Sequence, residues 1–173
     1  AVHAGIDHGK LVFAEDLDVT GIFETIMARV GRSALVMGMG NIGTGAYDEF
    51  KAQGHLTVGL DSDPGKAELH RKAGRRVLYA DAEDPGFWSH LDLHGVETVV
   101  LTMTEMEANL IATRQLRKRG FAGLISATVY YAEDVEPLKE AGADLVYDYH
   151  DGIGVGLARL SLEQRELSST AGL

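Results

Sequence analysis

The chain has 173 residues, of which 45% are hydrophobic and 24% charged, a composition typical of one soluble globular domain with a sizeable core. Its formal net charge of −10 argues against non-specific binding to nucleic acid or anionic lipid, because both carry negative charge themselves. The chain contains no cysteine, which excludes disulfides, thiolate metal sites and a cysteine nucleophile and is compatible with a cytoplasmic protein.

Residues 1–30 are predicted to form an N-terminal arm and a linker helix. Since the first residue is Ala1 rather than Met, we expect a fragment of a longer protein or a processed form. No apolar run approaches the ~20 residues that span a bilayer, and no signal peptide is visible. Thr20 is placed to cap a helix whose apolar stripe needs a partner inside or outside the domain. That stripe consists of Ile22, Phe23, Ile26, Met27 and Val30.

Strands and helices are predicted to alternate from residue 33 onwards. Short apolar runs bounded by glycine, proline or acidic residues predict six strands, and the segments with helical periodicity predict the helices that follow them. The strands lie at 33–38, 55–61, 76–80, 97–103, 121–128 and 143–149. The helices lie at 41–53, 64–74, 85–91 and 105–119, in a segment that ends at Gly142, and at 153–166.

Local signals indicate where several helices begin. Asp63 and Asp84 each precede a proline, and an N-cap aspartate followed by proline in the first helical position is a common helix start. Thr104 and Glu107 have the spacing of a capping box, which predicts the start of the next helix. Pro137 is expected to break the helix after the fifth strand.

Strands that are apolar on both faces and alternate with helices are typical of a parallel sheet covered on both sides. About six such units complete a Rossmann-like, doubly wound α/β fold in a single domain. We therefore assign residues 31–150 to this domain and residues 151–173 to a C-terminal helix and tail. The last helix carries Ile153, Leu157 and Leu160 on one stripe.

The segment GMGNIG leaves the first predicted strand and enters the first helix, the context that the dinucleotide-binding motif GxGxxG requires. Gly38 permits the tight turn, Gly40 lets a pyrophosphate approach the backbone, and Gly43 lets the helix pack closely on the strand. The amide groups at the helix start then face an anion, helped by the helix dipole. The alternative is a tight turn that binds nothing.

Asp61 supplies the acidic half of this motif. It ends the second predicted strand, 18 residues after Gly43, where a carboxylate can accept hydrogen bonds from both ribose hydroxyls. Its charge repels a 2′-phosphate, which favours NAD, NADH or an adenine nucleotide such as AMP over NADP. The alternative is that Asp61 is only solvated.

Further candidates follow the third and fourth strands. Asp81 lies where this topology predicts an adenine pocket, unless it serves only as a turn or cap residue. Thr102, Met103 and Thr104 end the fourth strand, beside the switch point at which ligands bind to such sheets. Thr104 suits an N-cap at least as well.

Three other clusters are better explained without a ligand. His90 and His94 have metal-ligand spacing, but no metal-site pattern surrounds them, so no metal site is assigned. Residues 147–151 contain Tyr, Asp and His at the end of a strand, where turn and cap residues are common, so no catalytic residue is assigned. Four basic residues compensate a helix dipole or else mark an interface or anion site. They are Arg71, Lys72, Arg75 and Arg76.

Four segments in order resemble the regulatory nucleotide-binding domain of potassium transport systems, the RCK or KTN (TrkA-N) domain. They are GMGNIG, VGLDSDP, VLYADAED and TVVLTMTEMEANLIATRQLR. The resemblance covers roughly residues 33–150 and is strongest to the cytoplasmic domain of Kef-type, glutathione-gated potassium efflux antiporters. The chain departs from the family pattern at Asn41, where many members carry Arg, and at Ala80, where they carry Gly.

The resemblance implies a domain that binds NAD, NADH or AMP as a regulatory ligand and forms a homodimer. It also implies a tethered or associated membrane antiporter or potassium channel domain, so that the chain would lie at the inner face of the cell membrane. The turn would cradle phosphates, Asp61 would hold the ribose, and the later residues would border the adenine and form the near wall. The implied binding residues are Gly38, Met39, Gly40, Asn41, Ile42, Gly43, Asp61, Ser62, Asp81, Ala82, Thr102 and Met103.

Two functions from different classes fit these observations. A regulatory domain needs only the ligand site, whereas a small NAD-dependent oxidoreductase also needs a substrate region and a placed acid or base. The strand–helix units use nearly all residues, and Tyr130 and Tyr131 lack a lysine four positions on. We therefore expect a non-enzymatic domain that gates a potassium efflux or antiport system, with an oxidoreductase or its cofactor-binding fragment as the alternative.

Overall fold

The computed structural model describes residues 5–7, 10–12 and 33–170 of the chain. The predicted linker helix, with Thr20 and its apolar stripe, lies outside the described residues. Within the arm, β1 (Gly5–Asp7) and β2 (Lys10–Val12) form an antiparallel pair.

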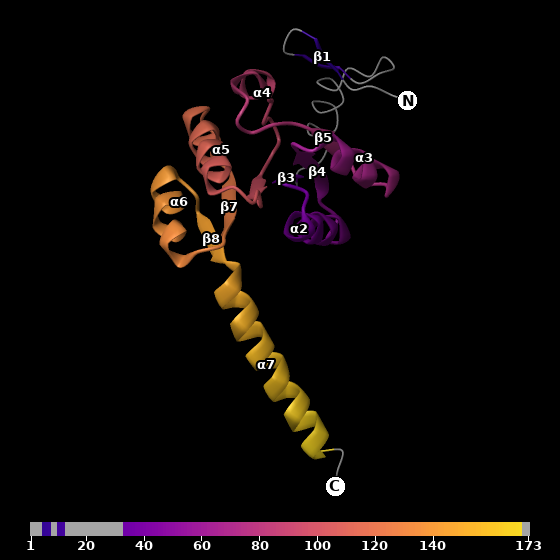
Figure 1. Cartoon of the computed structure of the whole chain (residues 1–173), viewed down its shortest axis with the longest axis vertical. Helices are drawn as coiled ribbons and strands as arrows, with labels where there is room; N and C mark the ends of the chain where they lie inside the picture. The colour runs from indigo at the N-terminus through magenta and orange to yellow at the C-terminus, as the bar shows by residue number, and fades with distance from the viewer. Residues whose placement is uncertain (1–4, 8–9, 13–32, 171–173) are drawn as a thin grey trace.

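A six-stranded parallel sheet forms the centre of the molecule (Figure 1). In the order β5-β4-β3-β6-β7-β8, the chain builds one half outwards from β3, returns, and builds the other half outwards from β6. The predicted Rossmann-like, doubly wound fold is therefore confirmed. The strands are β3 (Ser33–Met37), β4 (Leu56–Asp61), β5 (Val77–Tyr79), β6 (Thr98–Leu101), β7 (Leu124–Val129) and β8 (Leu145–Asp148).

A helical segment follows each strand of this sheet. Between consecutive parallel strands, such a segment returns the chain to the end of the sheet at which the next strand begins. A short 3-10 helix, η1 (Ala132–Asp134), precedes the helix after β7. The α-helices are α2 (Asn41–Ala52), α3 (Pro64–Lys72), α4 (Pro85–His90), α5 (Met106–Lys118), α6 (Val135–Ala141) and α7 (Tyr149–Thr170).

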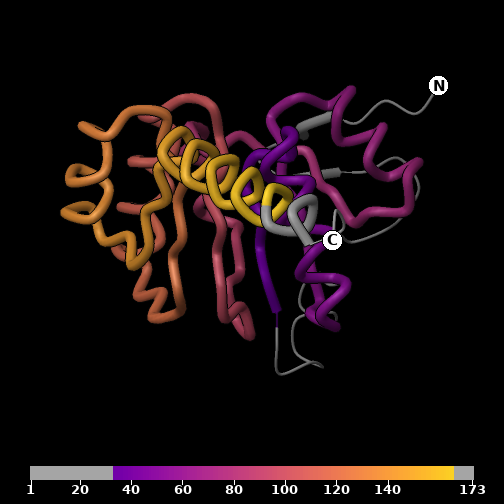
Figure 2. Tube along the Cα trace, turned by 90° about the horizontal axis from the view of Figure 1, so that it is seen from below, coloured from indigo at the N-terminus to yellow at the C-terminus, as the bar shows by residue number. Residues whose placement is uncertain are grey.

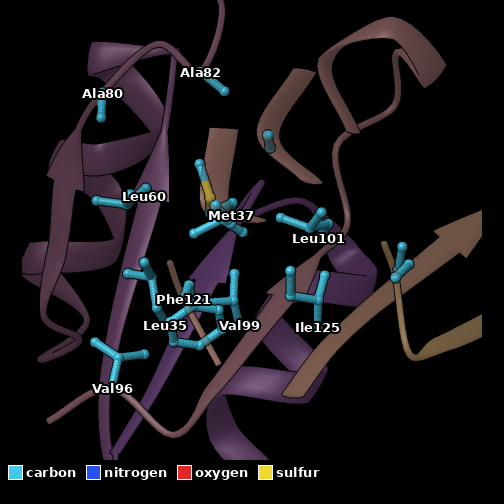
Figure 3. Close-up of a cluster of buried hydrophobic side chains, with 14 of the residues drawn as sticks. Leu35, Met37, Leu60, Ala80, Ala82, Val96, Val99, Leu101, Phe121 and Ile125 are labelled. Atoms are coloured by element: carbon cyan, nitrogen blue, oxygen red, sulfur yellow. The ribbon is translucent and has the colours of Figure 1, made fainter. Parts of the chain in front are cut away.

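The central strands β3 and β4 are buried on both faces of the sheet. Successive residues of a strand point to opposite faces, and every residue of β3 is buried. Leu35 and Met37 belong to the larger core, which includes Leu116 of α5 and is shown in Figure 3. Val36 belongs to a second core with Tyr47 of α2. This two-sided burial explains why β3 and β4 are apolar at nearly every position. The expected cover on both sides is incomplete at β7 and β8, where Leu124, Leu145 and Tyr147 are exposed.

The predicted aspartate caps are confirmed. Oδ1 of Asp63 accepts hydrogen bonds from the amides of Gly65 and Lys66 at 2.8 and 3.1 Å. Asp84 caps α4 in the same way, through the amide two residues later at 2.8 Å. In both cases the carboxylate satisfies amides that have no acceptor inside the helix.

Two predictions about helix boundaries are wrong. The N-cap of α5 is Glu105, whose side chain makes no capping bond, so the capping box of Thr104 and Glu107 does not form. Pro137 does not break a helix, because α6 begins only two residues earlier. In this first turn the missing amide of proline needs no partner.

The last helix begins at Tyr149 rather than at residue 153 as predicted. Oδ1 of Asp148 accepts hydrogen bonds from the amides of His150 and Asp151 at 3.0 and 3.2 Å, so the helix is capped directly at the end of β8. The polar cluster at residues 147–151 thus supplies the turn and cap that its position indicated.

Helix α7 extends away from the sheet at the edge where the strands end (Figure 1), and Figure 2 views the molecule from the side into which it projects. None of the helices in the described part of the chain is long and apolar enough to cross a membrane. Several apolar side chains of α7 are nevertheless at least half exposed. They are Ile153, Val155, Leu157, Leu160 and Leu162.

Candidate functional site

The glycine turn joins β3 to α2 at the carboxyl edge of the sheet. Gly38 has a φ of +93°, which L side chains rarely adopt, and a Cβ there would lie 2.8 Å from the amide nitrogen of Met103. A Cβ at Gly43 would overlap the carbonyl oxygen of Gly38 and lie 2.6 Å from Oγ1 of Thr102. The fold therefore requires glycine at both positions.

Gly40 differs from these two glycines. Its φ of −73° suits any residue, and a Cβ built there meets no protein atom within 4 Å. The first amides of α2 have no acceptor inside the helix, and Gly40, as the N-cap, has no side chain that could accept a capping hydrogen bond from them. The turn thus presents amide donors beside open space, at the positive end of the helix dipole.

Hydrogen bonds to the carbonyl groups hold the turn in position. Oγ1 of Thr102 donates to the carbonyl oxygen of Gly38 at 2.6 Å. Nε2 of His70 lies 2.8 Å from the carbonyl oxygen of Met39, whose side chain is buried in the core. Thr102 therefore has a structural role that the sequence analysis missed, in addition to its place in a pocket wall.

Asp61 is buried, with 7% of its surface exposed. Its Oδ2 accepts a hydrogen bond from the amide of Met39 at 2.8 Å, and its Oδ1 accepts one from the amide of Asp63 at 2.9 Å. The alternative of a merely solvated carboxylate is therefore wrong. Each oxygen retains a second lone pair, so the same carboxylate can still accept hydrogen bonds from a ligand.

A cavity of about 330 Å³, here called the first pocket, lies where β3, β4, β5 and β6 end. Its lining contains seven of the twelve predicted binding residues, namely Gly38, Asp61, Ser62, Asp81, Ala82, Thr102 and Met103. The other five lie on the adjoining turn and the start of α2. They are Met39, Gly40, Asn41, Ile42 and Gly43.

The ionisable side chains that line the first pocket, among the described residues, are all acidic. Oδ1 of Asp81 also accepts a hydrogen bond from the amide of Glu83 at 2.9 Å, so Asp81 both shapes a turn and faces the cavity. An acidic lining disfavours phosphate groups inside the pocket, whereas the amides at the turn attract them. These acidic residues are Asp61, Asp81, Glu83 and Glu105.

A cavity of about 300 Å³, here called the second pocket, lies on the other side of the end of β6 and shares residues 102–105 with the first. Ile42, at the start of α2, also lines it. The lining of this pocket includes an asparagine and three tyrosines that were not predicted as binding residues, although the tyrosines directly follow β7 or β8, where ligand-binding residues of this fold are expected. They are Asn109, Tyr130, Tyr131 and Tyr149.

The tyrosines beside the second pocket form an aromatic cluster. The ring centroid of Tyr130 lies 4.8 Å from that of Tyr131, 5.2 Å from that of Tyr149 and 4.1 Å from that of His150. Desolvation, and to a smaller extent Tyr130, raises the pKa of Tyr149 above its usual value. The Tyr149 hydroxyl therefore stays protonated at neutral pH.

The other polar clusters are held by structural contacts. Within the part of the chain that the structure describes, no group of three or more metal-ligating side chains occurs, and Nδ1 of His90 contacts a backbone carbonyl of its own helix at 2.9 Å. Arg75 pairs with Asp48 at 2.6 Å, and this hydrogen bond lowers the pKa of Asp48. Arg71 pairs with a glutamate of its own helix.

Comparisons with known proteins give the family of the chain and structures of similar fold. Residues 34–148 match the TrkA-N domain family. A search of curated protein sequences returned no significant match. Among solved structures, the NAD(P)-binding domain of an exopolyphosphatase-related protein from Archaeoglobus fulgidus is 28% identical with a TM-score of 0.68, over 76% of this chain and 98% of that one.

Two other similar structures are ligand complexes. The Kef CTD of Shewanella denitrificans in its AMP-bound form is 17% identical with a TM-score of 0.61, over 76% of this chain and 81% of that one. The GsuK channel bound to NAD is 21% identical with a TM-score of 0.59, over 68% of this chain and 21% of the channel chain. At these identities the likeness establishes the shared fold. On the family match, which covers residues 34–148 and thus all of the sheet except Ser33, the chain belongs to the TrkA-N domain family.

Proposed function

We propose that this domain binds an adenine nucleotide, NAD, NADH or AMP, at the glycine turn and in the first pocket, and that it acts as a regulatory sensor. The observation that carries the proposal is the open space at Gly40, a glycine that neither the backbone conformation nor the packing requires. A ligand phosphate that approaches the backbone explains why a side chain is missing there.

The proposed residue roles follow from their positions. Amides at residues 41–43 bind the phosphates, with help from the α2 dipole. Asp61 and Ser62 bind the ribose hydroxyls, while Asp81 and Ala82 border the adenine. The remaining wall consists of Thr102 and Met103.

The charge of the first pocket supports a ligand without a 2′-phosphate. The ribose lies, in this proposal, against Asp61, whose two oxygens both accept backbone hydrogen bonds and whose negative charge is close to the 2′ position. Asp81 and Glu83 add further negative charge to the lining. We therefore expect NAD and AMP to bind more tightly than NADPH.

The proposed partner is a membrane potassium channel or cation antiporter domain, tethered or associated, so that the chain would act at the inner face of the membrane. Support comes from the family and from similarity to a channel bound to NAD and a Kef CTD bound to AMP. We further propose a homodimer in which the exposed apolar side chains of α7, such as Leu157 and Leu160, become buried.

An NAD-dependent oxidoreductase is the second candidate. The observation that favours it is the presence of Tyr130, Tyr149 and His150 near the second pocket, since such side chains can transfer protons. A regulatory domain, in contrast, needs no proton transfer to its ligand.

Two measurements test the proposed function. Calorimetric titration of AMP, NAD, NADH and NADPH into the 173-residue chain should give saturable binding of the first three and clearly weaker binding of NADPH. The same protein, offered NADH with common keto acids, should oxidise it no faster than the background. The absence of binding by any adenine nucleotide would refute the ligand assignment, and sustained turnover would favour the oxidoreductase.

A further inference from the structure

Asn109 has an incomplete set of hydrogen bonds at the edge of the second pocket. The residue lies in the first turns of α5, and only 2% of its surface is exposed. Its Nδ2 donates to the carbonyl oxygen of Met103 at 2.9 Å, whereas its Oδ1 has no hydrogen-bond partner among the described residues.

The contact with Met103 fixes the orientation of this amide. Rotating the Asn109 carboxamide by 180° would place its oxygen against the carbonyl oxygen of Met103, two acceptors facing each other. The unpartnered atom is therefore an acceptor. Because a buried acceptor without a donor is costly, a ligand N–H group or a water molecule is expected to occupy the position beside it.

The second pocket has the chemistry of a site for a planar, electron-poor ring. Tyr130, Tyr131 and Tyr149 supply aromatic surface for stacking or edge contacts. The charged side chains that line it, among the described residues, are Glu105 and Asp134, both acidic. Such a lining favours a cationic ring over a neutral one and disfavours an anion.

The two pockets meet along residues 102–105, which line both cavities. A ligand with two ring systems joined by phosphates can therefore extend from the first pocket, past the amides of residues 41–43, into the second. The ring of an oxidised nicotinamide nucleotide is positively charged and carries a primary carboxamide. Its charge matches the acidic lining of the second pocket, and the carboxamide supplies an N–H donor for Oδ1 of Asn109.

We propose that Asn109 determines ligand specificity, because its Oδ1 accepts a hydrogen bond from the carboxamide of an oxidised nicotinamide ring in the second pocket. This proposal rests on the proposed function, since the adenosine half of the same ligand occupies the first pocket. Asn109 then favours the dinucleotide over AMP. Glu105 and Asp134 favour NAD⁺ over NADH, whose ring is neutral.

The test compares affinities for AMP, NAD⁺ and NADH in the parent and in Asn109→Leu, which keeps the branched shape of the side chain but removes both the Oδ1 acceptor and the Nδ2 donor to Met103. We expect the variant to bind NAD⁺ about five- to tenfold more weakly and AMP within about twofold of the parent. The matched control is Thr113→Val, one turn along α5, whose buried hydroxyl bonds the carbonyl of Asn109 and does not line the pocket. This control should leave the ratio of NAD⁺ to AMP affinity unchanged.

A second variant avoids the buried core. Glu105 lies on the exposed surface of the pocket rim and Asp134 is half-buried, so the double change Glu105→Gln and Asp134→Asn should preserve the fold. The parent is expected to prefer NAD⁺ to NADH, and this double variant should abolish that preference. Nicotinamide mononucleotide alone should bind far more weakly than NAD⁺, because it lacks the adenosine half.

Each contrary outcome has a distinct meaning. Equal affinity of the parent for AMP and NAD⁺, or an unchanged NAD⁺ affinity in Asn109→Leu, overturns the role of Asn109 while AMP binding still supports the proposed function. Mononucleotide binding as tight as that of NAD⁺ overturns the arrangement that spans both pockets. Loss of binding for all nucleotides, in the parent itself, refutes the proposed function instead.

Discussion

Replacing Asp61 by asparagine should destabilise the domain even without a ligand. The two carboxylate oxygens of Asp61 hold the amide of Met39 in the glycine turn and the amide of Asp63 in the following loop. The substitution keeps the shape of the side chain but removes its charge and converts one acceptor into a donor. One of the two amides then faces a donor instead of an acceptor.

The expected magnitude follows from the two bonds. A hydrogen bond to a charged group contributes about 1.5–3 kcal/mol, and one between neutral groups about 0.5–1.5 kcal/mol. The variant loses one charged bond and retains the other as a neutral one, which gives a loss of about 2–4 kcal/mol. The amide of Asp63 is near solvent and can bond to water, so we expect the substituted carboxamide to keep its oxygen on the buried amide of Met39.

Urea unfolding of the parent and of Asp61→Asn measures this loss directly. The matched control is Asp63→Asn, two residues away, where the side chain caps α3 and asparagine is an equally good N-cap. We expect the control to change the free energy of unfolding by less than about 0.5 kcal/mol. If the two variants are equally stable, the carboxylate of Asp61 does not organise the turn as argued.

Two further predictions concern the surface. Sedimentation of the parent at tens of micromolar should show a dimer, and a monomeric parent would contradict the dimer proposal. Leu157→Glu should shift the protein to monomer, because it places a charge on the apolar surface of α7. Arg159→Glu, on the same exposed helix, is the control and should leave the dimer intact. Since Arg75 lowers the pKa of Asp48, their ion pair should stabilise the fold near neutral pH and lose this effect as pH falls through that lowered pKa. The difference in unfolding free energy between the parent and Arg75→Gln should therefore shrink in acid, and a difference independent of pH would contradict the electrostatic explanation.

The sequence predicted those features that depend on neighbouring residues. The apolar runs of β3 and β4 follow from burial on both faces of a parallel sheet, and the glycine motif follows from the sharp turn into α2. Aspartate caps at Asp63 and Asp84 are local as well. Each of these signals lies within about four residues of the structure that it specifies, so tertiary contacts had little to override.

Features that depend on distant residues could not be predicted. The hydrogen bond between Met39 and Asp61 joins residues 22 positions apart. The second pocket collects side chains from α2, α5, β7, η1 and α7, and its key residue, Asn109, looks like an ordinary polar position on a helix. The start of α7 was misplaced because three glycines in its first turns weaken helix propensity, whereas the cap supplied by Asp148 decides the outcome.

The most direct test of the proposed nucleotide site compares Gly40→Val with Gly45→Val by calorimetric titration of NAD and AMP. A Cβ at either glycine meets no protein atom within 4 Å, so both variants are expected to fold. Only Gly40 lies at the turn where the phosphates are proposed to bind. Gly40→Val is expected to abolish binding, whereas Gly45→Val should bind like the parent. Equal binding by both variants would show that the phosphates do not bind at the glycine turn.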